Sequence, residues 1–139
     1  MVVLFISRPF ANFLFGLSIM YIFYLTMFPH PSLGIGVGIG GINLVPFEML
    51  HGLLTEQSLR TFMINVGGNI FLFVPFGFLL PWRFSQVHTV IHAAIIGALF
   101  STTIEITQLM ITNRFTDIDD IILNTLGTII GYVLFKISK

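Results

Sequence analysis

The segment FANFLFGLSIMYIFYLTMF, residues 10–28, has no charged side chain and is long enough to cross the hydrocarbon core of a bilayer, which takes about 20 helical residues. Further apolar segments follow at about residues 61–80, 89–111 and 118–135. Hydrophobic residues make up 55% of the 139 residues, charged residues 9%, and the mean hydropathy is +0.98. A soluble domain needs a far more charged surface. The sequence therefore predicts an all-α integral membrane protein, with one domain over residues 1–139 folded as a four-helix transmembrane bundle.

The basic residues predict the orientation of this bundle, because cytoplasmic loops carry an excess of Lys and Arg. If both termini are cytoplasmic, Arg60 and Arg114 lie outside and the other four basic residues lie inside. The first span has no small-residue cleavage pattern after it, so we expect a retained anchor and not a signal peptide. This orientation places the connections 29–60 and 112–117 together on the external side.

The first external connection is expected to be irregular. Its GIGVGIGG stretch, residues 34–41, contains a G-x-G-x-x-G match, but the strand–turn–helix context of a dinucleotide site is missing. The following NLVPFEML, residues 43–50, mixes polar and aromatic side chains and suits an interfacial position. We expect this loop to be able to fold back as a re-entrant segment into the mouth of the bundle, where protein shields its backbone from lipid.

The stretch NRFTDIDDIILNTLG, residues 113–127, gathers acids at the start of the fourth span. At about 100° per residue, Asp117, Asp120 and Asn124 fall within roughly 60° of one another, whereas Asp119 points about 160° away. Thr116 and Asp119 also fit a capping box, so a capping role is expected for Asp119. Farther along, Gly127 and Gly131 have the spacing of a helix-packing motif.

Two other spans carry polar stripes at the same depth. Ser101, Glu105 and Gln108 share one face of the third span, and Asn65 and Asn69 share one face of the second. The asparagines alone could equally be hydrogen-bond glue between helices. A carboxylate inside a span is costly and usually marks function or a buried partner, for which Arg114 is the best candidate. Together the stripes predict a polar binding cleft that opens outward and is formed by Asn43, Asn65, Asn69, Ser101, Glu105, Gln108, Arg114, Asp117, Asp120 and Asn124.

Four segments resemble, in order, the motif series of the VanZ-like family: NLVPF (43–47), GNIFLFVPFGFLLP (68–81), STTIEITQ (101–108) and RFTDIDDIILNTLGTIIGY (114–132). The resemblance implies a small multi-pass protein of the bacterial cytoplasmic membrane. The namesake of the family is linked to resistance against teicoplanin, a lipid-tailed glycopeptide antibiotic. The positions that match the family's motifs are Asn43, Pro46, Phe47, Asn69, Pro75, Gly77, Glu105, Gln108, Arg114, Asp117, Asp120, Asn124 and Gly127.

Functions of different classes remain open, and we favour a binding protein over an enzyme. As a binder, the protein would hold or remodel an envelope lipid or a lipid-linked cell-wall precursor, or hold a lipoglycopeptide antibiotic itself. As an enzyme, it would bind a divalent cation at Glu105, Asp117 and Asp120, with Glu105 or Asp117 as the catalytic base. Arg114 would then hold a phosphate or carboxylate of the lipid. A small transporter is the third reading and would require a homo-oligomer; no nucleic-acid partner is expected.

Overall fold

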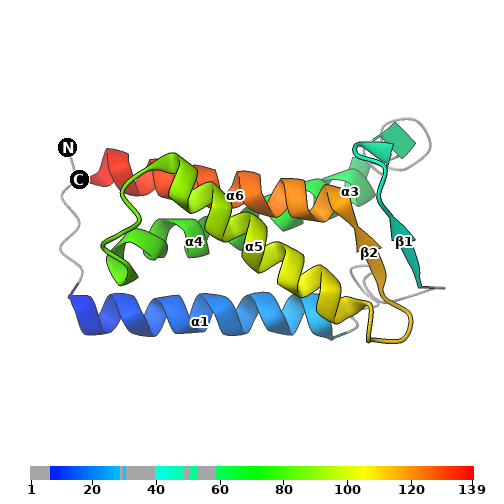
Figure 1. Cartoon of the computed structure of the whole chain (residues 1–139), viewed down its shortest axis with the longest axis horizontal. Helices are drawn as coiled ribbons and strands as arrows, with labels where there is room; N and C mark the ends of the chain where they lie inside the picture. The colour runs from blue at the N-terminus through cyan, green and yellow to red at the C-terminus, as the bar shows by residue number, and fades with distance from the viewer. Residues whose placement is uncertain (1–6, 29, 31–39, 49–50, 53–58) are drawn as a thin grey trace.

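The computed structural model describes residues 7–28, 30, 40–48, 51, 52 and 59–139. Within this part of the chain, four helical segments are long and apolar enough to cross a membrane, which confirms the predicted all-α bundle. They are α1 (Arg8–Met27), the segment Met63–Arg83, α5 (Val90–Gln108) and α6 (Ile118–Ser138) (Figure 1). The segment Met63–Arg83 consists of a π-helical turn, η2 (Met63–Gly67), and α4 (Gly68–Arg83), and the short helix α3 (Leu59–Phe62) precedes it.

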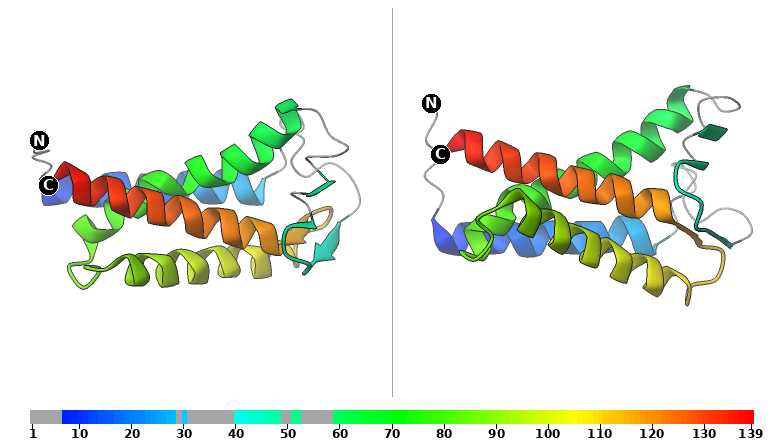
Figure 2. Two further views of the ribbon diagram at one scale, coloured as in Figure 1. Left: turned by 90° about the horizontal axis from the view of Figure 1, so that it is seen from above. Right: turned by 45° about the horizontal axis from the view of Figure 1, so that its top comes forward.

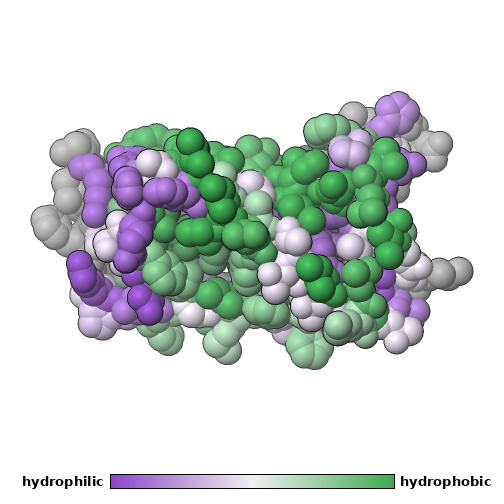
Figure 3. Space-filling view, in the orientation of Figure 1, coloured by the Kyte–Doolittle hydropathy of each residue, from purple (hydrophilic) through white to green (hydrophobic). Residues whose placement is uncertain are grey.

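Helix α6 lies between its neighbours and packs against both α4 and α5, while α1 packs mainly against α4 (Figure 2). The start of α1 and the end of α6 lie at the same end of the molecule (Figure 1). Hydrophobic side chains cover its middle, and hydrophilic side chains gather at that end (Figure 3). The arrangement is that of a bundle whose apolar belt faces lipid.

Helices α4 and α6 approach each other closely because glycines face the opposing backbone. A Cβ atom added at Gly131 would meet the carbonyl oxygen of Val74, and one added at Gly127 would meet that of Ile70. From α4, Gly77 lies in the same way against the carbonyl oxygen of Thr128. The predicted packing role of Gly127 and Gly131 is therefore confirmed, and the small residues allow backbone contact without a side chain between the helices.

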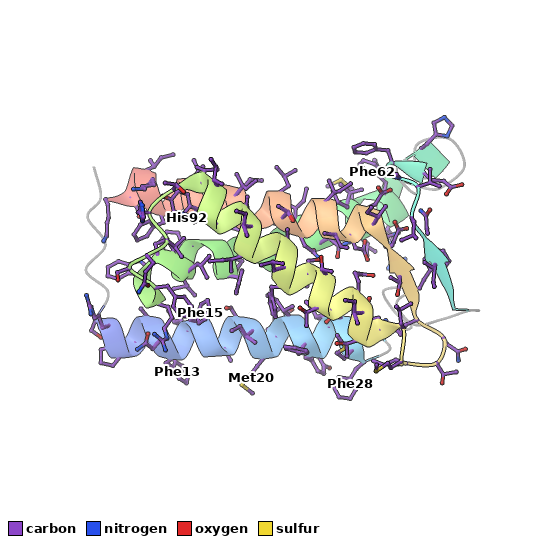
Figure 4. The ribbon with its side chains drawn as sticks, viewed as in Figure 1. Phe13, Phe15, Met20, Phe28, Phe62 and His92 are labelled. Atoms are coloured by element: carbon purple, nitrogen blue, oxygen red, sulfur yellow. The ribbon has the colours of Figure 1, made fainter. Side chains whose placement is uncertain are left out.

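Aromatic side chains fill the space between α1, α4 and α5. Phe15 of α1 stacks on Phe76 of α4 with ring centroids 5.4 Å apart, and Phe76 stacks in turn on Phe100 of α5 at 5.0 Å. Figure 4 shows Phe15 pointing into the bundle, whereas Phe13 and Met20 point away from it toward the expected lipid. These inward rings fix α1 against the rest of the bundle.

A short parallel strand pair joins two loops at the other end of the bundle. Strand β1 (Gly41–Asn43) pairs with β2 (Phe115–Asp117), and Asn43 lies opposite Asp117. The sequence did not indicate this pair, because strands of three residues carry no readable periodicity. Most of the loop expected to be re-entrant lies outside the described residues, and its described part, residues 40–48, lies beside the start of α6.

Candidate functional site

Polar side chains of α4, α5 and α6 meet at the end of the bundle that carries β1 and β2. We call this cluster the polar seam, and its contacts run mostly between elements far apart in the sequence. The polar seam consists of Asn69, Ser101, Glu105, Gln108, Arg114, Asp117, Asp120 and Asn124.

Glu105 connects the end of α5 to the start of α6. Its Oε2 accepts a hydrogen bond from the backbone N–H of Asp117 at 2.9 Å. Its carbonyl oxygen also accepts a hydrogen bond from the Thr116 hydroxyl at 3.3 Å. Glu105 and Asp117 are each only 3% exposed, so this connection lies away from the surface. The hydrogen-bond partner of the carboxylate among the described residues is therefore a backbone amide.

Asp117 caps α6 and also binds the first loop. Its Oδ1 accepts a hydrogen bond from the N–H of Asp119 at 2.9 Å, and the Asn43 side chain donates to both of its carboxylate oxygens at 3.3 Å. Burial raises the pKa of Asp117 above its ordinary value, although the hydrogen bonds from Asp119 and Asn43 oppose this. Asp117 therefore both caps α6 and attaches residues 41–43 to the start of this helix.

Two side-chain hydrogen bonds run across the seam to α6. Asn69 of α4 donates to Oδ1 of Asp120 at 2.6 Å, and Asn124, one turn further along α6, donates to Oγ of Ser101 in α5 at 2.8 Å. Asp120 and Asn124, four residues apart on α6, thus contact two different neighbouring helices. A third bond, from Gln108 to the carbonyl oxygen of Thr26 at 2.9 Å, reaches α1.

Arg114 is buried near two of these acids. It is 8% exposed, and burial lowers the pKa of its guanidinium, whereas the charges of Glu105 and Asp120 raise it. Its Nε has no hydrogen-bond partner among the described residues. Arg114 was the expected partner of Glu105 and lies within electrostatic range of both acids, but its Nε makes no hydrogen bond with either of them.

Comparisons with known proteins identify relatives of the chain by sequence. The VanZ/LLP1 family matches residues 15–139, a range that holds the four spans almost completely and the whole polar seam. The chain belongs to the VanZ/LLP1 family. It is also similar to Protein VanZ of Enterococcus faecium, with 37% identity over 110 residues, covering 70% of this chain and 68% of that relative. No solved structure matches the chain.

The structure of this VanZ-family protein corrects the expected role of Asp119. Asp119 is 0% exposed, and its Oδ1 accepts a hydrogen bond from the backbone N–H of Phe47 at 2.6 Å. Asp117, and not Asp119, supplies the helix cap, and the Thr116 hydroxyl binds Glu105 instead of completing a capping box. Helical phase predicts the direction of Asp119 but not that residues 43–48 cover that face.

The remaining predicted residues behave differently from one another. Asn43 binds Asp117, but Asn65 lies in η2, and its side chain forms no hydrogen bond with the described residues. The residues of the polar seam do not line a hollow of about 560 Å³ among the described residues. That hollow lies between α1 and α4 and has an almost wholly apolar lining, including Leu17 and Pro75. The hydrophobicity of α1 was the only feature of the sequence related to this hollow.

The cation site also has a different geometry from the expected one. Among the described residues, no group of three or more His, Asp or Glu side chains is arranged to hold a metal ion. Glu105, Asp117 and Asp120 instead accept hydrogen bonds from a backbone amide or from asparagine. These three carboxylates belong to one polar region without forming a shared metal centre. Thr116 was expected in a capping box and Phe47 only as a position that matches the family's motifs, so the contacts of the Thr116 hydroxyl and the Phe47 amide were not predicted.

Proposed function

We propose that this protein binds an envelope lipid or a lipid-linked cell-wall precursor through the polar seam, and that this binding contributes to resistance against teicoplanin-type glycopeptides. One observation carries the proposal: Glu105, Asp120 and Arg114, charged groups from different elements, converge at one end of the spans. Charged groups are costly at membrane depth and are retained chiefly where they serve function. The resistance context comes from membership in the VanZ/LLP1 family and from the teicoplanin link of its namesake.

The proposal places the polar seam at the outer face of the cytoplasmic membrane. Four of the six basic residues belong to the opposite end, where α1 begins, α4 ends and α6 ends: Arg8, Arg83, Lys136 and Lys139. By the excess of basic residues on cytoplasmic loops, that end faces the cytoplasm. Lipid-linked precursors and glycopeptide antibiotics would then meet the seam from outside.

A resistance assay tests this function with Asp120→Asn. The parent protein and the variant are expressed in a teicoplanin-sensitive bacterium, and the inhibitory teicoplanin concentration is measured alongside the amount of protein in the membrane. An amide at this position still accepts the hydrogen bond from Asn69, so we expect a graded loss. One hydrogen bond is worth about 0.5–1.5 kcal/mol, which corresponds to roughly 2- to 13-fold in affinity.

The matched control is Glu48→Gln, which removes an exposed acid from the same end of the molecule. We expect it to leave resistance unchanged. Unchanged resistance with Asp120→Asn and also with Glu105→Gln, at normal membrane levels, would contradict the proposal. Complete loss with Asp120→Asn, together with dependence of the parent on added magnesium or manganese, would favour a cation-dependent enzyme instead.

A further inference from the structure

Hydrogen-bond acceptors outnumber donors in the polar seam. Gln108 is 7% exposed and Asn124 is 2% exposed, and the side-chain carbonyl oxygen of each is buried without a partner among the described residues. The amide nitrogens of both are already used, by Thr26 and Ser101 respectively. Among the donors of the polar seam, Nε of Arg114 is buried without a partner in the described part of the chain. Buried polar atoms are normally paired, so these unpaired oxygens indicate a missing group that donates.

The carboxylates of Glu105 and Asp120 add acceptors about one helical turn from Gln108 and Asn124 respectively. Glu105 uses Oε2 for the Asp117 amide, and Asp120 uses Oδ1 for Asn69, and the described residues make no hydrogen bond to the second oxygen of either carboxylate. Two contacts hold the acids on facing sides of α5 and α6. Asp117 binds Glu105 three residues before Asp120, and Asn124 binds Ser101 one turn beyond. Both charges also act on Arg114, so all three groups lie in one region.

The balance of charge in the polar seam indicates which class of ligand the seam would bind. Glu105, Asp117 and Asp120 supply three carboxylates, whereas Arg114 is the one basic side chain in the seam. An anionic ligand group at Arg114 would also face Glu105 and Asp120, which repel it. A protonated amine would be attracted by both acids and has three N–H donors for the free oxygens. Arg114 would remain available for one acceptor atom beside the amine.

We propose that the ligand of the polar seam is recognised through a primary ammonium group, held between Glu105 and Asp120. This inference rests on the proposed function, because it names the chemistry of the ligand that the seam binds. The ammonium can belong to a lipid headgroup or to a soluble amine, and both sources present the same donors.

The seam can be reached from the side of α4. Asp120 and Asn69 are only half-buried, whereas Glu105 and Asn124 lie deeper. The turn before Asn69 is the π-helix η2, which is followed by Gly68, an exposed residue without neighbours where a side chain would be. Single π-helical turns are frequent at functional sites, and this one adjoins the accessible edge of the seam. We therefore place the entry of the amine beside Asn69 and Asp120.

Binding of paired lipids to the purified full-length protein in detergent tests the inference. The probes are phosphatidylethanolamine and its N-acetylated counterpart, which share phosphate and acyl chains but differ in the ammonium group. Ligand-induced increase of the unfolding temperature and native mass spectrometry report binding. We expect phosphatidylethanolamine to bind about tenfold or more tightly than the acetylated lipid, since hydrogen bonds to charged groups are the stronger class.

Variants of the seam residues show which side chains produce the preference for the amine. Glu105→Gln and Asp120→Asn keep an acceptor oxygen and should abolish the preference for the amine, whereas Glu48→Gln should retain it. Arg114→Gln should also retain the preference, because it removes a positive charge that competes with the ammonium. Gel filtration of each variant shows whether it is still folded. Lysinamide and its Nε-acetyl derivative distinguish the sources: binding of lysinamide as well indicates recognition of the amine alone, and binding of the lipid only indicates a headgroup.

The inference is overturned if both lipids bind equally and Arg114→Gln abolishes binding, since the seam would then recognise the phosphate. That result would leave the proposed lipid binding intact. Failure of every amine probe to bind the folded protein would also overturn it, and the proposed function would then depend on the resistance assay. If seam variants change neither resistance nor binding, the proposed function itself fails.

Discussion

At the scale of single residues, Asp119 shows how a charged side chain can serve the fold from inside a membrane protein. Its carboxylate accepts the hydrogen bond of the Phe47 amide, and Phe47 has a φ of 65°, a conformation that is rare for aromatic residues. The Phe47 ring itself is 58% exposed, so packing does not fix it. The backbone contact with Asp119 therefore holds residues 43–48 against α6.

Replacing Asp119 with alanine should lower the stability of the protein. The change removes the acceptor of the Phe47 amide, and a hydrogen bond to a charged group is worth about 1.5–3 kcal/mol. Thermal unfolding in detergent, followed by circular dichroism, measures the loss. Glu48→Ala removes an exposed acid from the same loop and should have little effect. Equal unfolding temperatures for Asp119→Ala and the parent would show that this contact does not hold the loop.

Asp117 should make stability depend on pH. Burial raises the pKa of Asp117, so the folded state binds its proton more tightly than the unfolded state. Its contribution to stability is therefore complete below the ordinary value of about 4 and is lost as the pH rises through the higher folded value. The difference in unfolding free energy between the parent and Asp117→Asn, measured from pH 4 to pH 8, should follow this curve. A difference that grows in favour of the parent with rising pH would have the wrong sign.

At the scale of secondary-structure elements, the contact between α4 and α6 depends on glycine. Gly127 and Gly131 on one helix and Gly77 on the other bring backbone atoms within contact distance of the facing helix. Inside lipid, where apolar side chains gain little by leaving their surroundings, such close packing is a main source of helix association. The polar seam depends on this contact, because Asn69 and Asp120 lie on the same two helices.

Gly131→Val should disrupt the bundle. Its side chain would collide with the carbonyl oxygen of Val74 and lie close to Phe78 N, which is 2.6 Å from the Cβ position. Because the neighbours are backbone atoms, they cannot move aside easily. We expect aggregation or a large fall in the yield of monodisperse protein by gel filtration. Gly16→Ala in α1 is the control, since nothing lies within 4 Å of its Cβ position, and helix propensity favours alanine by about 1 kcal/mol.

At the scale of the whole molecule, both ends of the bundle are defined by the polar residues that collect there. Four basic side chains lie where α1 begins and where α4 and α6 end, and three aspartates lie at the end of β2 and in the first turn of α6. Lys139 lies 4.7 Å from the centre of the Trp82 ring, which anchors the end of α6 to α4. Basic and aromatic residues of this kind are typical of membrane interfaces.

Cysteine labelling can test the orientation directly, because the natural sequence contains no cysteine. A membrane-impermeant maleimide applied to intact cells should label Asn113→Cys, in the connection between α5 and α6. It should label Ser85→Cys, in the connection between α4 and α5, only after the cells are opened. Both side chains are exposed, so each is accessible to the reagent. The reverse pattern would place the polar seam in the cytoplasm and remove the basis for an extracellular ligand.

Most of the fold could be predicted because length and hydropathy determine a transmembrane helix with little help from tertiary contacts. The spacing of Asp120 and Asn124 likewise predicted that both side chains face neighbouring helices. The contact of Asp119 with Phe47 could not be predicted in this way, because it joins positions 72 residues apart through a backbone amide. Helical phase describes one element, whereas burial depends on which other element covers it.

The pairing of β1 with β2 has a consequence for the synthesis of the protein. Asn43 follows the first span, and its partner Asp117, 74 residues later, directly precedes the last. A ribosome that has delivered α1 to the membrane must still produce two more spans before the first loop can take its final form. Until then, the edge of β1 and the Phe47 amide lack their native hydrogen-bond partners. In a nascent chain that is stopped before residue 115, residues 40–48 should therefore be accessible to proteases and chaperones. We expect this accessibility to end when the last span has been synthesised.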